Sequence, residues 1–548
     1  MNNLLFLSFY LIFYISGIGI NKLFSRKAND DLNILNNSKF LLHDLYPLLT
    51  LFVLGNLNLA INFFLPLNKS VVPVLLVIFS LFIFGLIESI KSKLKNVNLF
   101  NQVFIPLIVS ISSYGIKFHY DAGAYHLNFQ NWIYQERIVL GLSNLNPYYS
   151  YGSIQEYISA TFQYFNLNLL NYFVELTFFV SFLGLLHTLI RQNKNYFLKN
   201  SALLLSIFLF LDNFGFKGGG NGSVQIQMVG KPDTAVGILW VVSTLIIFNG
   251  FVRKESNNID FFIILLTSLF AFQLKVNSGP LFILIIFYMI YFKNTINLFQ
   301  KNNLYLYSIA FLYLVKNFLI SGCVIYPLNF SCIPAAGWLN FAHIRESSYI
   351  TIRDNRRLRL GDGFTEWFNN FFSHAYNEQI YKNLLLTLII IFCFNKVFYK
   401  RPVKNTGLKI FYLIYLILNY ALFLLTVPAF RNGYGLFMST ILIFTISENP
   451  IKKSFQILFN RYTYFTLILI ICVLLPRSFM YSDAISNNLE LKDFEMGTST
   501  YTNFDESYVF PNENNQCWKK QNCILKTQHN VEIKTSKINN YLIIKSNG

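Results

Sequence analysis

Two histidines and an aspartate lie close together in the stretch HYDAGAYHLNFQNWI, residues 119–133. Imidazole and carboxylate groups often transfer protons or bind metals. A metal site of His119, Asp121 and His126 would lack a fourth ligand, and hydrogen-bonded histidines are the simpler interpretation. Asp121 begins a helical pattern and could cap it. A carboxylate at a helix start is also oriented and stabilised as an anion, so capping does not exclude catalysis.

Other charged residues with the chemistry to bind a substrate stand at the edges of apolar runs. GKPDTAVGILW, residues 230–240, places Lys231 and Asp233 at a predicted helix start, where proline and an acid are typical. Lys275 and Arg431 adjoin apolar runs from which long basic side chains can reach water. Alternatively, they neutralise a phosphate at the depth of lipid headgroups, where arginine can make two parallel hydrogen bonds.

The composition places these residues in a membrane protein. The chain has 548 residues, of which 54% are hydrophobic and only 13% are charged. Apolar runs of about 20 residues recur, and that length crosses a hydrocarbon core. The net charge of +18 comes from basic residues in short connections, and the sequence lacks the basic helix or patch of a nucleic-acid-binding protein. We therefore expect an all-α integral membrane protein that does not bind nucleic acid.

The apolar runs predict about fourteen transmembrane helices within a polytopic domain of residues 1–477. Their predicted limits are 3–21, 45–67, 71–90, 101–117, 168–190, 201–214, 233–252, 259–274, 279–292, 303–321, 382–399, 408–427, 433–447 and 463–476. The first run lacks a basic n-region and a cleavage site, which favours a retained span over a signal peptide.

Basic residues mark one alternating set of connections, such as those after residues 21, 90, 190 and 252. The positive-inside rule assigns this set to the cytoplasm. With fourteen spans, both termini then lie outside. The predicted external segments are the loops 118–167, 215–232 and 322–381 and a C-terminal tail, 478–548. In the first loop, apolar residues at helical spacing over 122–140 predict an amphipathic helix at the membrane interface.

Four of the six cysteines fall in the predicted external segments as two pairs. Cys323 and Cys332 share the long loop, and Cys517 and Cys523 share the tail. Such pairs fit disulfides in an oxidising compartment, although two pairs can also arise by chance. Neither pair has the spacing of a metal site.

Several stretches together resemble the GT-C superfamily of membrane glycosyltransferases and, more closely, a little-characterised family of large bacterial membrane proteins of GT-C-like pattern. The matching stretches are YDAGAYHLNFQNWIYQERIVLGLSNLN, KPDTAVGIL, LKVNSGP, KNFLISGCVIYPLNFSCIP, FRNGYG and NQCWKKQNC. That family has a pattern similar to YDSGLYH in its first loop. Here Ala122 and Ala124 differ, but Asp121 and His126 are kept.

The resemblance implies a catalytic site on the external face of a bacterial inner membrane. Enzymes of this superfamily pass a sugar from a polyprenyl-phosphate-linked donor to a cell-surface glycan, lipid or protein acceptor. Asp121 would be the general base or would stabilise an oxocarbenium-like sugar. Lys231, Lys275 or Arg431 would stabilise the phosphate leaving group, with His126 and Asp233 beside them. Some relatives use a divalent metal, but nothing in this sequence requires one.

Two other functions remain open. One is a polysaccharide polymerase or ligase that uses lipid-diphosphate donors and grips the growing chain with an arginine-rich segment. These arginines are Arg345, Arg353, Arg356, Arg357 and Arg359. The other is a non-enzymatic lipid-carrier flippase, which would depend on polar residues at mid-depth in the membrane.

Overall fold

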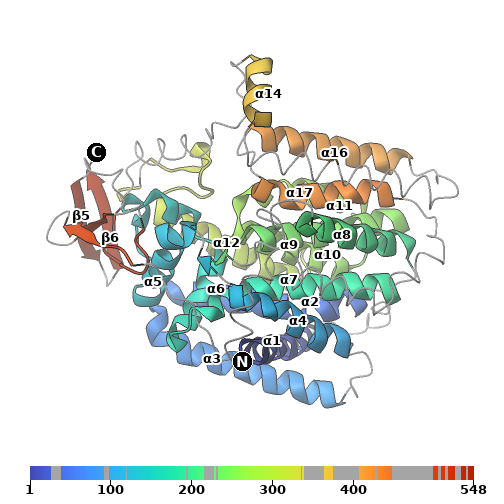
Figure 1. The fold of residues 1–548 in the computed structure, drawn as a ribbon, viewed down its shortest axis with the longest axis horizontal. Coiled ribbons are helices and arrows are strands. Elements are labelled where there is room, and N and C mark those ends of the chain that lie inside the picture. Colours follow the sequence, from blue (N-terminus) through green and yellow to red (C-terminus); the bar gives the residue numbers. More distant parts are fainter. Residues whose placement is uncertain are drawn as a thin grey trace.

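A computed structural model gives the fold of the chain (Figure 1). The residues that it describes are 1–25, 39–91, 98–115, 117–118, 120–192, 195–214, 228–229, 232–334, 336–338, 363–373, 385, 406–425, 430–446, 498–503, 508–512, 516–524, 532–538 and 541–547. Within these ranges the chain is predominantly helical, with three small two-stranded sheets.

The helices form one bundle. The longer α-helices are α1 (Asn2–Ser25), α2 (Lys39–Asn62), α3 (Leu67–Lys91), α7 (Leu169–Gln192), α8 (Tyr196–Phe214), α9 (Asp233–Arg253), α10 (Asn258–Leu274), α12 (Lys301–Ser321) and α16 (Thr406–Leu425). Shorter ones are α4 (Ile105–Val109), α5 (Leu127–Gln135), α6 (Ile154–Phe162), α11 (Leu281–Tyr291), α14 (Phe364–Ser373) and α17 (Phe430–Leu442). The π-helices η2 (Phe100–Phe104) and η4 (Ala122–His126) precede α4 and α5.

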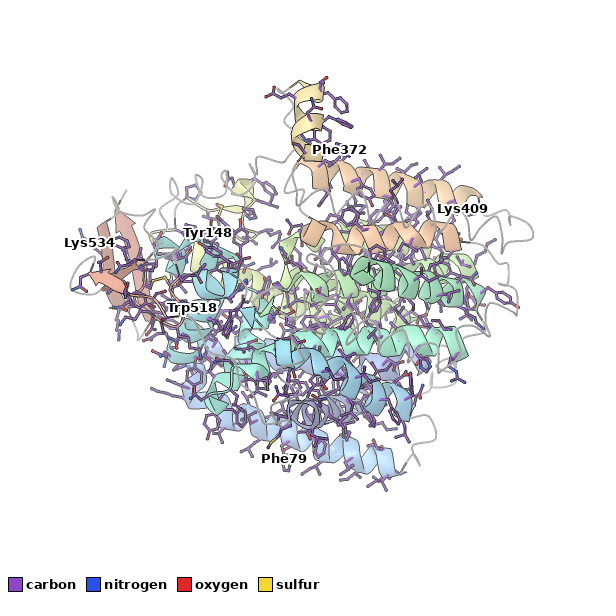
Figure 2. All side chains as sticks on the ribbon, viewed as in Figure 1. Phe79, Tyr148, Phe372, Lys409, Trp518 and Lys534 are labelled. Atoms are coloured by element: carbon purple, nitrogen blue, oxygen red, sulfur yellow. A yellow bond between two sulfur atoms is a disulfide. The ribbon has the colours of Figure 1, made fainter. Side chains whose placement is uncertain are left out.

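Seven helices in the described part of the chain are long and apolar enough to cross a membrane: α1, α2, α3, α7, α9, α12 and α16. Helix α7 is wholly buried at the centre, whereas about a third or less of α3, α12 and α16 is buried. Phe79 on α3 illustrates the outward apolar face of these outer helices (Figure 2). Such faces suit a hydrocarbon surround.

The predicted spans agree closely with the helices where the two can be compared. The predicted 382–399, apart from Leu385, and 463–476 lie outside the described residues. The other predicted spans each coincide with a helical segment, although several segments are shorter than a membrane crossing. The 101–117 span is built from three short pieces, η2, α4 and the 3-10 helix η3 (Ser110–Gly115), rather than from one helix.

The helix predicted over 122–140 differs from the expectation. It ends at Gln135 and begins with the π-helical turn η4. Asn128 and Asn131 on this helix donate hydrogen bonds to the backbone carbonyls of Lys520 and Lys519. The C-terminal tail therefore covers the polar side of α5, and residues 127–133 are buried within the protein.

The tail contributes small strands at one end of the bundle (Figure 1). Strands β3 (Tyr501–Asn503) and β4 (Val509–Pro511) pair antiparallel, as do β5 (Glu532–Ile538) and β6 (Tyr541–Asn547). Helix α14 is an unpredicted helix within the predicted 322–381 loop, and it projects from the bundle (Figure 1).

A third, parallel pair aligns two loops that are distant in sequence. Strand β1 (Lys117–Phe118) pairs with β2 (Met228–Val229). The first of these strands precedes Asp121, and the second precedes Asp233 at the start of α9. This pairing brings two of the predicted site segments to the same end of the bundle.

Candidate functional site

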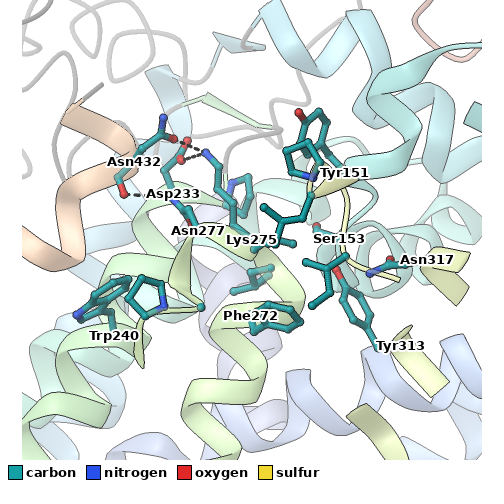
Figure 3. Close-up of a pocket in the computed structure, with 18 of the residues that line it drawn as sticks. Tyr151, Ser153, Asp233, Trp240, Phe272, Lys275, Asn277, Tyr313, Asn317 and Asn432 are labelled. Carbon is teal, nitrogen blue, oxygen red and sulfur yellow. Dashed lines mark hydrogen bonds and ion pairs between the residues drawn. The ribbon is translucent and has the colours of Figure 1, made fainter. Parts of the chain in front are cut away.

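A cavity of about 1080 Å³ lies between the first loop and the ends of α9, α10, α12, α16 and α17. The residues on its walls include Tyr120, Asp121, Tyr125, His126, Tyr148, Tyr151, Asp233, Lys275, Asn277, Asn317 and Asn432, with Leu265, Leu269, Phe272, Leu306, Ala310 and Leu314 farther along. Figure 3 shows Asp233, Lys275 and Asn432 on one side and Tyr151, Ser153 and Tyr313 on the other. One part of the cavity is thus polar, and another part is apolar.

The turn η4 supplies the acid and the histidine that the sequence singled out. Asp121 precedes the turn and His126 ends it, and both side chains line the cavity. A π-helix has i→i+5 hydrogen bonds, so residues five apart stand near one another on one side of the turn. The Asp121 side chain makes no capping hydrogen bond to this helix. The capping role proposed from the sequence is therefore wrong.

His126 is anchored by a carboxylate that we did not predict. Its Nδ1 atom is hydrogen-bonded to Oε1 of Glu156, and both side chains are buried. Glu156 belongs to a capping box at the start of α6, where it accepts hydrogen bonds from the N–H and the hydroxyl of Ser153. The pattern S-I-Q-E could have revealed the capping box. Nothing in the sequence pairs Glu156 with His126.

Lys275 and Asp233 form an ion pair in the cavity wall (Figure 3). Asp233 opens α9, where the helix dipole favours an anion. Lys275 follows the last residue of α10, and its ammonium also donates to Oδ1 of Asn432 at 2.7 Å. The side chain of Asn277 donates to the Asn432 carbonyl at 3.0 Å. Lys275 is thus held in place rather than extended into water.

The apolar part of the cavity follows α10 and α12. From Leu306 to Asn317, α12 contributes wall residues over a rise of about 16 Å. Tyr307 and Leu422 line the cavity and are 40% and 45% exposed to solvent. The cavity therefore reaches the outward apolar faces of α12 and α16.

Tyrosines surround the Asp121 side of the cavity. Tyr148 stacks on Tyr125 with 5.3 Å between the ring centroids. Burial, with the nearby Tyr120 and the charge of Asp121, raises the pKa of the Tyr148 hydroxyl above its ordinary value. Tyr148 therefore stays a neutral hydrogen-bond donor at physiological pH.

The C-terminal tail contacts the turn that carries Asp121 on both sides of that residue. The Gln516 amide donates to the Tyr120 carbonyl at 3.2 Å, and the Trp518 N–H donates to the Gly123 carbonyl at 2.7 Å. A side chain at Gly123 would collide with the end of Gln516. The disulfide Cys517–Cys523 closes the loop that contains Trp518 and begins directly after Gln516.

Removing this disulfide should loosen the turn at Asp121. For the Cys517→Ser, Cys523→Ser variant, we expect a loss of about 2–3 kcal/mol of local stability. Hydrogen–deuterium exchange should then rise over 516–524 and over 120–131. The Cys323→Ser, Cys332→Ser variant is the matched control, because it breaks the other disulfide and should affect 322–334 alone. Unchanged exchange over 120–131 in the first variant would refute the contact's role.

The structure brings four of the predicted site residues into one cavity: Asp121, His126, Asp233 and Lys275. His119 and Lys231 lie outside the described residues, as do the arginines between 345 and 359. Arg431 is the second residue of α17, beside the cavity residue Asn432. Both predicted cysteine pairs are present as disulfides.

Among the described residues, no group of three His, Cys, Asp or Glu side chains is placed to hold a metal ion. Three of the ionisable groups on the cavity wall instead take part in two separate pairs: His126 with the buried Glu156, and Lys275 with Asp233.

Comparison with known proteins identifies a family without an assigned activity. No curated protein and no solved structure matches the chain. Residues 1–438 match the family described as a domain of unknown function (DUF8201). This segment includes every residue that lines the cavity, but it excludes the disulfide loop of the tail. Because the match extends over most of its length, the chain belongs to this family.

Proposed function

We propose that the protein is a membrane glycosyltransferase of GT-C type. It would move a sugar from a polyprenyl-phosphate-linked donor to a glycan, lipid or protein acceptor at the outer face of a bacterial inner membrane. The observation that carries the proposal is the cavity, in which an apolar part reaches the outer faces of α12 and α16 and a polar part contains Asp121, His126 and Lys275.

The apolar part suits the lipid chain of such a donor. Its walls are leucines, Phe272 and Ala310, and these bury methyl-branched hydrocarbon favourably. Because Tyr307 and Leu422 are exposed, a lipid could enter sideways from a surrounding bilayer. A water-soluble sugar nucleotide would gain little from this apolar wall.

The polar part suits a phosphate and a sugar. The Lys275 ammonium has three donors, and its contacts with Asp233 and Asn432 use two of them. The third can meet a phosphate oxygen and stabilise the leaving group. Tyr125, Tyr148 and Tyr151 offer ring faces with polar tips. In this proposal Asp121 is the catalytic carboxylate beside the sugar.

Filling the apolar part tests whether a lipid-linked donor binds there. Replacing Ala310 by tryptophan should obstruct the cavity, and an overpacking cost of about 1–3 kcal/mol corresponds to about 5- to 150-fold weaker binding. The measurement is sugar transfer by the purified full chain from radiolabelled polyprenyl-phosphate monosaccharides. Cells that lack the gene should also lack the transferred sugar in their cell-surface glycans.

Phe311→Trp is the matched control for this substitution. Phe311 is the next residue on α12, is 66% exposed and does not line the cavity. This variant should transfer sugar as the unmodified protein does. If Ala310→Trp and Phe311→Trp had equal activity, the lipid of the donor would not bind in the cavity.

A further inference from the structure

The contact between His126 and Glu156 decides which ring nitrogen faces a bound molecule. An ionised carboxylate only accepts hydrogen bonds, so Nδ1 of His126 carries the proton in its contact with Glu156. His126 lines the cavity, and Nε2 is the nitrogen that remains for a molecule bound there. In a neutral ring protonated at Nδ1, Nε2 has a lone pair and accepts protons.

The position of Glu156 is fixed by its neighbours. Its Oε2 atom accepts from the Ser153 N–H at 2.7 Å and from the Ser153 hydroxyl. The buried Lys316 Nζ donates to the Gly152 carbonyl at 2.6 Å and so holds the backbone next to Ser153. Glu156 therefore cannot turn away from His126 without losing these bonds.

We infer that His126, positioned by Glu156, is the general base of the proposed sugar transfer, and that Asp121 instead stabilises the positive charge on the sugar. This inference rests on the proposed function. Histidine is the most frequent general base. The arrangement of a cavity-facing imidazole oriented by a buried carboxylate is the base half of a catalytic triad. Asp121 lines the same cavity, where its carboxylate can face a positively charged sugar.

The transfer balances with these groups. The acceptor hydroxyl gives its proton to Nε2 of His126, and its oxygen bonds to C1 of the sugar. The bond between C1 and the phosphate oxygen breaks, and the electron pair leaves with the phosphate beside Lys275. Asp121 faces the cationic sugar at the moment of transfer. Glu156 touches none of the reacting atoms, and it stabilises the imidazolium that forms.

An acceptor that has no proton to lose distinguishes the general base from the group that stabilises the cationic sugar. With the donor that the unmodified protein uses, His126→Gln should lower kcat about 100-fold or more, with KM little changed. Glu156→Gln should lower kcat in the same way, by a smaller factor. Sodium azide attacks C1 as an anion, so it should restore transfer by His126→Gln, with a glycosyl azide as product. Azide should not restore Asp121→Asn.

Glu175→Gln is the control for the loss of a buried carboxylate. Glu175 accepts a hydrogen bond from Gln155, the neighbour of Glu156, and does not line the cavity. This variant should keep normal kcat. Unchanged kcat in His126→Gln, or azide rescue of Asp121→Asn in place of His126→Gln, would overturn the inference.

A second measurement does not depend on activity. In the full chain labelled with ¹⁵N-histidine in nanodiscs, the His126 signals are identified by their loss in His126→Gln. The neutral ring should carry its proton on Nδ1, and Glu156→Gln should weaken this preference. A proton on Nε2 in the unmodified protein would overturn the inference. If the unmodified protein transfers sugar from no donor, the proposed function fails, and the ¹⁵N spectra still decide whether Glu156 sets the His126 tautomer.

Discussion

Replacing Asp121 by asparagine should abolish most sugar transfer while leaving the protein folded. We expect kcat to fall about 10²–10⁴-fold, the range for a group that acts on the transition state as a base or as an anion. Asparagine has nearly the same shape but no charge. The Asp121 side chain does not cap η4, so the turn should keep its conformation. Initial rates of transfer to the acceptor measure the effect.

A second aspartate at a helix start provides the control. Asp260 lies in the first turn of α10 and does not line the cavity. Asp260→Asn should therefore transfer sugar at the normal rate. If Asp121→Asn retained full kcat with the same melting temperature as the unmodified protein, Asp121 would have no part in catalysis. A common fall in activity and melting temperature would instead show that the loss is structural.

The sequence was sufficient to locate most helices because hydrophobicity is a local property. Apolar runs predicted the limits of α7, α9 and α12 to within a few residues. The start of α9 was predicted especially well, since Pro232 and Asp233 are local helix-start signals. The three pieces of the 101–117 segment were not separated, because the prediction treated the segment as one continuous apolar run.

Contacts between distant segments could not be predicted in this way. A helical pattern with polar residues on one side looks the same whether that side meets water or another part of the chain. Asn128 and Asn131 meet carbonyls of the tail, which lies nearly 390 residues later. The burial of α5 follows from this contact and not from its own sequence.

In the candidate site, too, the residues could be selected from the sequence, but their contacts could not. Residue chemistry was enough to select Asp121, His126, Asp233 and Lys275, since charged groups beside apolar runs are costly without a role. Their partners depend on the fold. Lys275 reaches Asp233 across 42 residues, and this pairing makes the two predicted substrate ligands partners of each other. A single sequence has no signal for such a pair.

Replacing Gly85 by alanine should strongly destabilise the helix bundle. At Gly85, α3 crosses α1 so closely that a Cβ atom would lie 2.0 Å from the Ile15 carbonyl oxygen and 3.0 Å from the Gly19 nitrogen. Both neighbours are helix backbone and cannot rotate away. Small residues permit such contacts between membrane helices. We expect the free energy of unfolding to fall by about 3 kcal/mol.

The loss of stability should also affect the candidate site, because α3 packs against α5 and α6. Helix α5 directly follows the turn with Asp121 and His126, and α6 contains Glu156. Gly407→Ala is the matched control: Gly407 lies in α16 with open space around it, and alanine favours a helix. Unfolding by SDS in mixed micelles should therefore shift to lower SDS for Gly85→Ala and stay unchanged or rise for Gly407→Ala. Equal midpoints would show that α1 and α3 can separate without cost, and the tight crossing would then contribute nothing to stability.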